Sequence, residues 1–206
     1  MQEQDIYGKY GAYLPKILED LSQRIQEAND RVKQETGQKL FEHFNARIKQ
    51  AASMEEKCQR KNLPRVPESA LKEIRDAIGI RIVCGFIEDI YQTIEVLRQL
   101  EGCEIVLEKD YIRAAKPNGY RSYHLILEVE TPYEDCHGQN PGRYFVEIQL
   151  RTIAMDSWAS LEHQMKYKHE IKDNKRIVRE LKRCADELAS CDVTMQTIRN
   201  LIRESE

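Results

Sequence analysis

Residues 143–151 read RYFVEIQLR, and this stretch decides the fold class because its second half alternates strictly between apolar and polar side chains. Successive side chains of a β-strand point to opposite faces of the sheet, so the two sets are expected on different faces. The apolar set is Val146, Ile148 and Leu150, and the polar set is Glu147, Gln149 and Arg151. The polar face is either a solvated strand surface or the lining of a cleft, and its acid, amide and guanidinium favour a cleft.

Three further strands are expected before this one, because runs rich in β-branched and aromatic residues lie between turn signals. They cover residues 78–84, 104–112 and 122–129. A helix over residues 86–100 separates the first two, since apolar residues recur there at helical spacing. Helices also precede and follow the strands. The sequence therefore predicts a mixed α+β fold with a sheet of about four to five strands flanked by helices, and with long N- and C-terminal helices.

The chain has 206 residues and is expected to form a single domain over residues 1–206. We divide it into an N-terminal helical region (1–38), a core (39–170) and a C-terminal helix (171–206). Within these parts, periodicity predicts helices over residues 6–35, 39–61 and 67–75, and from Thr152 almost to the end.

The last helix carries a heptad pattern, in which apolar residues alternate spacings of four and three. These residues are Ile177, Leu181, Cys184, Leu188, Cys191, Met195, Ile198 and Ile202. The pattern fits packing on the N-terminal helix of the same chain, and it also fits packing on another subunit. Spacing alone does not decide between the two.

Composition excludes several classes of protein. The chain is 41% hydrophobic and 33% charged with a net charge of −3, which is typical of a soluble protein and gives no support to nucleic-acid binding, single-stranded RNA included. No signal peptide and no membrane-spanning run are visible, so we expect a cytoplasmic protein without a membrane partner. The six cysteines form no CxxC pair or zinc pattern, and free thiols are expected.

Two residues at the first strand suggest chemistry. Asp76 lies just before it, where an aspartate either belongs to a helix end or turn or holds Mg²⁺ with most of its waters in place. Arg81 lies within the strand between buried-looking neighbours, and a guanidinium there needs a carboxylate, a phosphate or a stacked ring as partner.

Cations gather around a predicted helix start. Ser53 and Glu56 fit a capping box, which predicts that a helix begins at Ser53. Arg47, Lys49 and Lys57 surround that start, where free N–H groups and the helix dipole favour anions. The cluster is either a solvated surface or a site for a polyphosphate.

The turn KPNGYRSYH (residues 116–124) carries more chemistry than a turn requires. Its Pro-Asn-Gly core, with Asn118, shapes a loop that Lys116 and Arg121 flank, and Tyr120 offers a ring to a base. His124 is either structural or shares a face with Glu147. In the next helix, Trp158 and Leu161 are expected in the core, whereas Glu162 and His163 reach the cleft or face solvent.

Four motifs in this order resemble the small alarmone synthetases, the stand-alone synthetase members of the RelA/SpoT family. The motifs are RIKQAASMEEK (47–57), RDAIGIRIVC (75–84), EKDYIRAAKPNGYRSYH (108–124) and VEIQLRTIAMDSWASLEHQMKYK (146–168). The resemblance implies a nucleotidyltransferase-like synthetase core in residues 39–170. It also implies a GTP/GDP diphosphokinase of the stringent response, a cytoplasmic homotetramer that uses Mg²⁺. This enzyme transfers the β,γ-pyrophosphate of ATP to the 3′-hydroxyl of GDP or GTP, with GMP as a further candidate acceptor.

The resemblance also implies residue roles. Arg47 and Arg81 would sandwich adenine, and the ATP phosphates would be held by Lys49, Ser53 and Lys57. Asp76 would bind Mg²⁺, and Glu147 would be the base or a second metal ligand. The acceptor would be bound by Lys116, Asn118, Tyr120, His124 and Gln149.

The chain departs from the family pattern at His43, Asn45 and Asp156, because members that bind alarmone in a central regulatory cleft have other residues there. A carboxylate at position 156 would repel a polyphosphate, so allosteric activation by product is expected to be weak or absent. Two alternative functions stay open. One is pyrophosphate transfer to adenosine nucleotides or tRNA, since stacking on Tyr120 does not choose a purine. The other is a non-catalytic module that binds alarmone or RNA.

Overall fold

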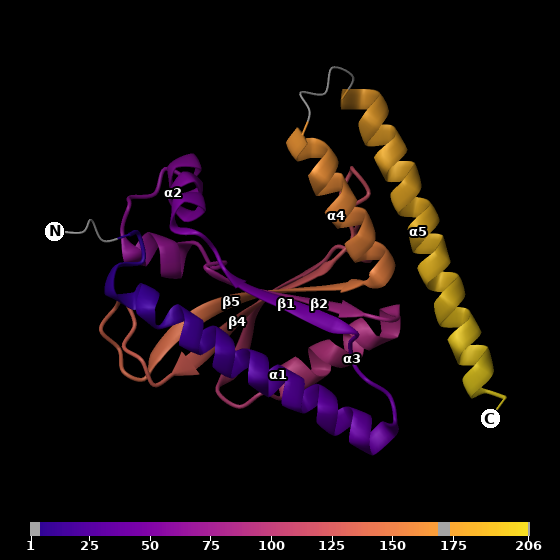
Figure 1. The fold of residues 1–206 in the computed structure, drawn as a ribbon, viewed down its shortest axis with the longest axis horizontal. Coiled ribbons are helices and arrows are strands. Elements are labelled where there is room, and N and C mark those ends of the chain that lie inside the picture. Colours follow the sequence, from indigo (N-terminus) through magenta and orange to yellow (C-terminus); the bar gives the residue numbers. More distant parts are fainter. Residues whose placement is uncertain (1–4, 169–173, 206) are drawn as a thin grey trace.

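A five-stranded mixed sheet lies at the centre of the molecule (Figure 1). The computed structural model describes residues 5–168 and 174–205, so the expected boundary between residues 170 and 171 lies outside the described residues. The spatial order of the strands is β1-β2-β5-β4-β3, in which only the β2–β5 pair is parallel. The strands are β1 (His43–Ile48), β2 (Ile78–Cys84), β3 (Cys103–Asp110), β4 (Tyr123–Thr131) and β5 (Gly142–Thr152). The predicted mixed α+β class is confirmed.

One face of the sheet forms the hydrophobic core with α1 (Leu14–Thr36) and α3 (Ile87–Arg98), which lie together on that side in Figure 1. The apolar side chains of β5 that alternate with the polar ones are fully buried, as the sequence predicted: Val146, Ile148 and Leu150. They meet Leu21 of α1 and Ile94 of α3 in one cluster. Each such side chain contributes about 1.5–3 kcal/mol by leaving water.

The segment 39–61 is not the continuous helix that its periodicity predicted. Residues His43–Ile48 form the edge strand β1, antiparallel to β2, and only α2 (Ala51–Arg60) is helical. Phe44 and Ile48 pack against the core, and pairing with β2 satisfies the backbone groups. In a six-residue run with few apolar residues, spacing does not distinguish a strand from a helix. The conformation of this segment is set by its pairing with β2.

The helix in this segment also begins earlier than expected. It starts at Ala51 after Gln50, which makes no side-chain cap, so the predicted capping box at Ser53 is wrong. Ser53 instead lies in the first turn of α2 with an exposed side chain. A short π-helix, η2 (Ser69–Glu73), occupies most of the segment predicted as a short helix at residues 67–75.

The remaining helices lie on the opposite side of the sheet or at its end. Figure 1 shows α2 and α4 (Ile153–Lys168) on the side away from α1, with α5 (Asn174–Arg203) running beside α4. In α4, Trp158 is buried and its indole N–H donates to the Leu181 carbonyl of α5 at 2.9 Å. The prediction that Leu161 belongs to the core is wrong, because it is 54% exposed.

The heptad pattern of α5 serves two different surfaces. Leu181 packs with Trp158 of α4, and Arg199 pairs with Asp89 of α3 at 2.6 Å, so the partners of α5 are α4 and α3 rather than the N-terminal helix. The C-terminal half of the pattern, by contrast, faces outward. Its exposed members are Met195, Ile198 and Ile202, and the exposed Val193 and Leu201 lie beside them on the same half of the helix.

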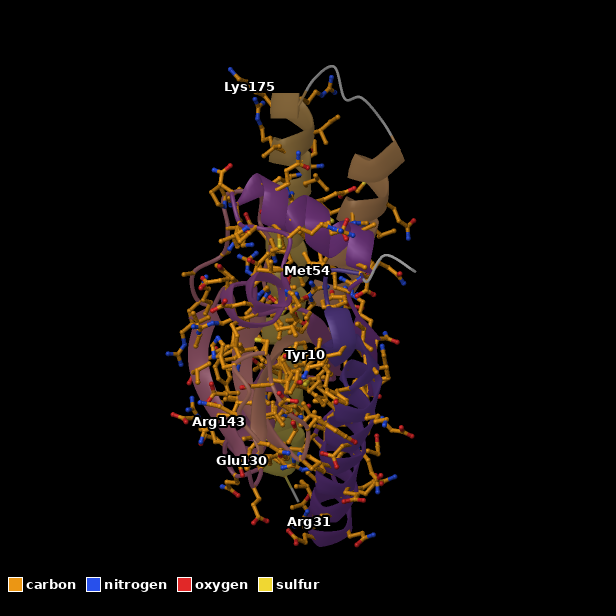
Figure 2. All side chains as sticks on the ribbon, turned by 90° about the vertical axis from the view of Figure 1, so that its left-hand side faces the viewer. Tyr10, Arg31, Met54, Glu130, Arg143 and Lys175 are labelled. Carbon is orange, nitrogen blue, oxygen red and sulfur yellow. The ribbon has the colours of Figure 1, made fainter. Side chains whose placement is uncertain are left out.

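The surface is rich in charged side chains, whose nitrogen and oxygen ends lie around the periphery in Figure 2. Exposed examples from different elements are Arg31, Glu130, Arg143 and Lys175. Within residues 5–168 and 174–205, no helix combines the length and apolar character that crossing a membrane requires. All six cysteines are free thiols.

Candidate active site

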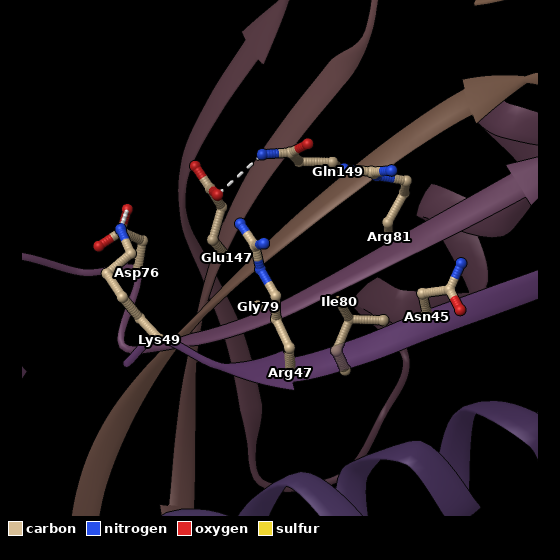
Figure 3. A pocket seen from close by; sticks show the side chains of 9 residues that line it. All are labelled: Asn45, Arg47, Lys49, Asp76, Gly79, Ile80, Arg81, Glu147 and Gln149. Carbon is tan, nitrogen blue, oxygen red and sulfur yellow. Dashed lines mark hydrogen bonds and ion pairs between the residues drawn. The ribbon is translucent and has the colours of Figure 1, made fainter. Parts of the chain in front are cut away.

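A cavity of about 220 Å³ opens on the polar face of the sheet (Figure 3). Strand register builds it in rows: Arg47, Gly79 and Glu147 are neighbours across β1, β2 and β5, and the next row begins with Asn45. Figure 3 shows Lys49 and Asp76 at one end and Arg81 and Asn45 at the other, with Arg47 and Glu147 between them. The lining residues are Asn45, Arg47, Lys49, Asp76, Gly79, Ile80, Arg81, Glu147 and Gln149.

Gly79 forms the floor of this cavity between two long side chains, Arg47 and Glu147. A Cβ atom placed on Gly79 would meet only the Arg47 carbonyl oxygen, at 4.0 Å, so the space above it is open. A flat, open floor between a guanidinium and a carboxylate leaves room for a planar ring or a sugar. This role is not evident from the sequence, because a glycine within a strand also fits a bulge or a tight bend.

At one end of the cavity, Asp76 is held by two lysines from different elements. Its Oδ2 atom accepts hydrogen bonds from Lys49, which follows β1, and from Lys57 of α2. Burial opposes ionisation of Asp76, but the hydrogen bonds and charges of these lysines outweigh it and lower the pKa of the carboxyl group. Burial also lowers the pKa of Lys49. Lys49 and Lys57 thus form ion pairs with the same oxygen of Asp76.

The donor set at this end fits a divalent cation. Asp76 Oδ1 is buried and has no hydrogen-bond partner among the described residues, although a buried carboxylate oxygen without a partner is costly. Glu147 lines the same cavity with a quarter of its side chain exposed. No group of three His, Cys, Asp or Glu side chains suited to a metal occurs in the described ranges. Two carboxylates suit Mg²⁺, which keeps waters and takes further ligands from phosphates.

Arg81 lies at the other end, and its partner is a residue that the sequence did not suggest. Its Nη1 atom is 3.4 Å from Asp156 Oδ1, in the first turn of α4. Burial and the positive charges of Arg151 and Arg47 lower the pKa of Arg81, while Asp156 opposes them. The prediction that Arg81 needs a partner is therefore confirmed, and the partner is the Asp156 carboxylate.

The pairing also changes the interpretation of Asp156. Its Oδ1 atom accepts a hydrogen bond from Arg151 Nη1 at 2.9 Å, so two guanidiniums neutralise the carboxylate. Repulsion of a polyphosphate by Asp156, the reason for expecting weak activation by product, does not follow from this arrangement.

Glu147 is oriented by its neighbours on the same face. Gln149 donates its Nε2–H to Glu147 Oε2 at 2.9 Å, and His124 Nδ1 lies 3.8 Å from Glu147 Oε1. His124 is opposite Gln149 in the β4–β5 register, so the structure places it on the face of the Glu147 row. Burial, followed by the charges of Arg151 and nearby lysines, lowers the pKa of His124 to about 4. The ring is therefore neutral near pH 7.

The loop with Lys116 and Asn118 adjoins this row. Tyr120 Oη lies 2.8 Å from His124 Nε2 and accepts a hydrogen bond from Arg151 Nη2 at 2.9 Å. The Lys116 ammonium lies 4.7 Å from the centre of the Tyr120 ring. Asn118 accepts from the Tyr120 backbone N–H through Oδ1 and donates to a carboxylate of α4 through Nδ2. A base that stacks on Tyr120 would compete with the Lys116 ammonium.

The structure brings most of the predicted site residues together, but not all of them. Lys57 contacts Asp76 at the cavity. The other predicted residues that do not line the cavity are Ser53, Lys116, Asn118, Tyr120 and His124, of which His124 and Tyr120 adjoin the Glu147 row. The carboxylate that Asn118 contacts belongs to Glu162, at 3.2 Å, so that residue reaches the site. Gly79 and Tyr111 had no role in the sequence analysis, and Asn45, Arg151 and Asp156 were not expected to build the nucleotide site as they do here.

Comparisons with known proteins agree on one family. A family described as a region found in RelA / SpoT proteins matches residues 46–172. The GTP pyrophosphokinase YwaC of Bacillus subtilis is 43% identical over 151 residues, which cover 73% of this chain and 70% of that protein. The crystal structure of small alarmone synthetase 1 from Bacillus subtilis bound to its product pppGpp has a TM-score of 0.81 at 29% identity. Its structure bound to AMPCPP has a TM-score of 0.75 at 26% identity, and both matches cover 95% of this chain and 97% of the other.

Proposed function

The chain belongs to the RelA/SpoT family, and we propose that it is a small alarmone synthetase that transfers the β,γ-pyrophosphate of ATP to the 3′-hydroxyl of GDP or GTP. One observation carries the proposal. Two carboxylates, Asp76 and Glu147, line one cavity together with Lys49, Arg47 and Arg81. Pyrophosphoryl transfer requires little covalent chemistry from the protein beyond positioning, neutralisation of phosphate charge and a base near the nucleophile.

The donor nucleotide is assigned to the side of the cavity that β1, β2 and α2 form. Arg47 and Arg81 hold adenine between them, since both side chains line the cavity, Arg47 opposite Gly79 on β1 and Arg81 two residues beyond Gly79 on β2. Lys49 and Lys57 bind the ATP phosphates in place of their hydrogen bonds to Asp76, and Ser53 adds its hydroxyl from the first turn of α2.

Asp76 is the residue that would hold Mg²⁺, and Glu147 lines the same cavity. The unpartnered Oδ1 atom of Asp76 supports this assignment. When bound, the ion neutralises charge that develops on the transferred phosphates. Asp76 also keeps Lys49 and Lys57 close together, so the carboxylate positions both lysines for the phosphates.

The acceptor is assigned to the opposite side, where Glu147 removes the proton from its 3′-hydroxyl. Gln149 holds one oxygen of Glu147, which leaves the other directed toward His124 and the cavity. Tyr120 stacks on the guanine base, with Asn118 fixing the backbone of the loop. Lys116 and His124 contact the acceptor phosphates, and Lys116 has an exposed ammonium able to move there.

We also propose that the enzyme is a cytoplasmic homotetramer. The exposed apolar residues on the C-terminal half of α5 support self-association, because a row of such side chains is unusual on a monomer. Light scattering coupled to size-exclusion chromatography measures the number of subunits directly.

Thin-layer chromatography of labelled ATP with GDP, GTP or GMP and Mg²⁺ tests the activity. We expect label from the β,γ-phosphates to appear in guanosine tetra- or pentaphosphate. Transfer to ATP, AMP or tRNA in place of the guanine nucleotides would assign a different acceptor. No transfer to any acceptor, with nucleotide binding retained, would indicate a non-catalytic module and refute the proposal.

A further inference from the structure

Asp156 joins two arginines that belong to different halves of the site. Its Oδ1 atom accepts from Arg151 Nη1 at 2.9 Å and lies 3.4 Å from Arg81 Nη1. Arg81 extends from β2 into the donor side of the cavity, whereas Arg151 stands near the end of β5 beside the acceptor loop. Asp156 itself does not line the cavity, and only 20% of its side chain is exposed.

The two guanidiniums depend on this carboxylate. They lie on either side of one oxygen atom, and their like charges repel each other. In the described part of the chain, Asp156 is the only acidic side chain that forms an ion pair with Arg81 or with Arg151. The Nε atoms of both arginines are buried without a hydrogen-bond partner among the described residues, so the terminal nitrogens make the contacts that fix each side chain.

The contacts of Arg151 extend from Asp156 to the acceptor side. Its Nη2 atom donates to Tyr120 Oη at 2.9 Å and to Gln149 Oε1 at 3.0 Å. Gln149 in turn holds Glu147. Arg151 is almost completely buried, with 6% of its side chain exposed, so its charge requires a nearby anion. A substitution at Asp156 is therefore expected to shift Arg151, and with it the positions of Tyr120 and Gln149.

We propose that Asp156 is a positioning residue that sets the place of Arg81 beside the donor purine and of Arg151 beneath the acceptor loop. The inference rests on the proposed function and adds to it a residue that touches neither substrate. One substitution at Asp156 should therefore weaken the binding of both nucleotides, whereas a substitution at Arg81 should weaken only ATP binding.

The substitution Asp156→Asn tests this, because it keeps the shape and removes the charge. We expect KM to rise about tenfold for ATP and about threefold to tenfold for GDP, the scale of one charge-assisted hydrogen bond, with kcat within about threefold of wild type. Asp156→Glu should restore both KM values in part, since it returns the carboxylate. Arg81→Ala should raise KM for ATP and leave KM for GDP unchanged.

A purely structural role predicts a different result. If Asp156 only stabilises the fold, the variant contains less folded enzyme, which lowers the apparent kcat and leaves both KM values unchanged. The thermal melting temperature of each variant detects such a loss of folded enzyme. The matched control is Glu180→Gln, which breaks an exposed pair with Arg183 at 2.8 Å on α5. If Asp156→Asn leaves both KM values and the calorimetric Kd for AMPCPP at wild-type levels while wild type makes alarmone, the inference fails and the proposed function stands. If wild type makes no alarmone, the proposed function fails, and the Kd for AMPCPP alone then decides whether Asp156 positions Arg81.

Discussion

Replacing Asp76 by asparagine should abolish most of the activity and leave the fold intact. The variant keeps the shape of the side chain but loses the charge that holds Lys49 and Lys57 and that would bind Mg²⁺. We expect a loss of about 3–6 kcal/mol in transition-state stabilisation, which is about 10²–10⁴-fold in kcat/KM. The larger part should appear in kcat, because phosphate charge develops in the transition state.

The cost to stability should be much smaller, and it should depend on pH. Each lysine donates one charge-assisted hydrogen bond worth about 1.5–3 kcal/mol, but burial of the carboxylate offsets part of this, so we expect a net loss of about 1–3 kcal/mol in unfolding free energy. The folded pKa of Asp76 lies below its ordinary value of 3.8. Its contribution is therefore present above pH 3.8 and is lost as pH falls through the lowered pKa.

Two measurements separate these effects. Initial rates at several Mg²⁺ concentrations give kcat and the metal requirement, and urea titration at pH 7 gives the unfolding free energy. The matched control is Glu56→Gln, which removes a carboxylate from the exposed side of α2, next to Lys57 in sequence. Wild-type kcat in Asp76→Asn, with an unchanged Mg²⁺ requirement, would refute the assignment of Asp76. A fall in activity matched by global unfolding would leave the residue a structural role only.

Three further predictions concern other parts of the molecule. Gly79→Val should raise KM for ATP at least about tenfold without loss of thermal stability, because the added carbons enter the open cavity; steady-state kinetics with unchanged KM would contradict it. Between pH 6.5 and about 4, wild type should lose up to about 3 kcal/mol of unfolding free energy, because His124 takes up a proton in the unfolded chain but resists it when buried. His124→Gln should not show this loss. Urea titrations in which wild-type and variant stabilities fall in parallel across this range would contradict the prediction. Ile198→Glu should lower the particle mass in light scattering, and an unchanged mass would exclude this face of α5 from assembly.

Four of the five strands were predicted from the sequence, including β3 at one edge, whereas β1 at the other edge was not. β2 and β5 lie side by side in the sheet, and their burial forces apolar residues into regular patterns that can be recognised without a structure. β1 pairs on one side only and exposes most of its side chains, so its sequence carries little pattern. Its conformation is set by the open edge of β2, a tertiary effect that local spacing does not contain.

The site divides in a similar way. Lys49, Lys57 and Asp76 were identified from chemistry that stands out locally, namely cations at a helix start and a carboxylate before a strand. Asp156 was missed as a partner of Arg81 because 75 positions separate the two, and the first turn of a helix often carries an acid for local reasons. Only the parallel pairing of β2 with β5, followed directly by α4, brings that turn beside Arg81.

The positive charge of this site is local, and this limits the substrates that it can select. Four cationic side chains, Arg47, Lys49, Lys57 and Arg81, stand around the carboxylates of Asp76 and Glu147, although the chain as a whole carries −3. Salt screens charges beyond about 8 Å, so a bound polyphosphate experiences the nearby cations far more than the distant acidic surface. The net charge of −3 gives a long nucleic acid no general attraction beyond the cavity. The arrangement therefore favours nucleotides with a short, dense run of phosphates over nucleic-acid chains.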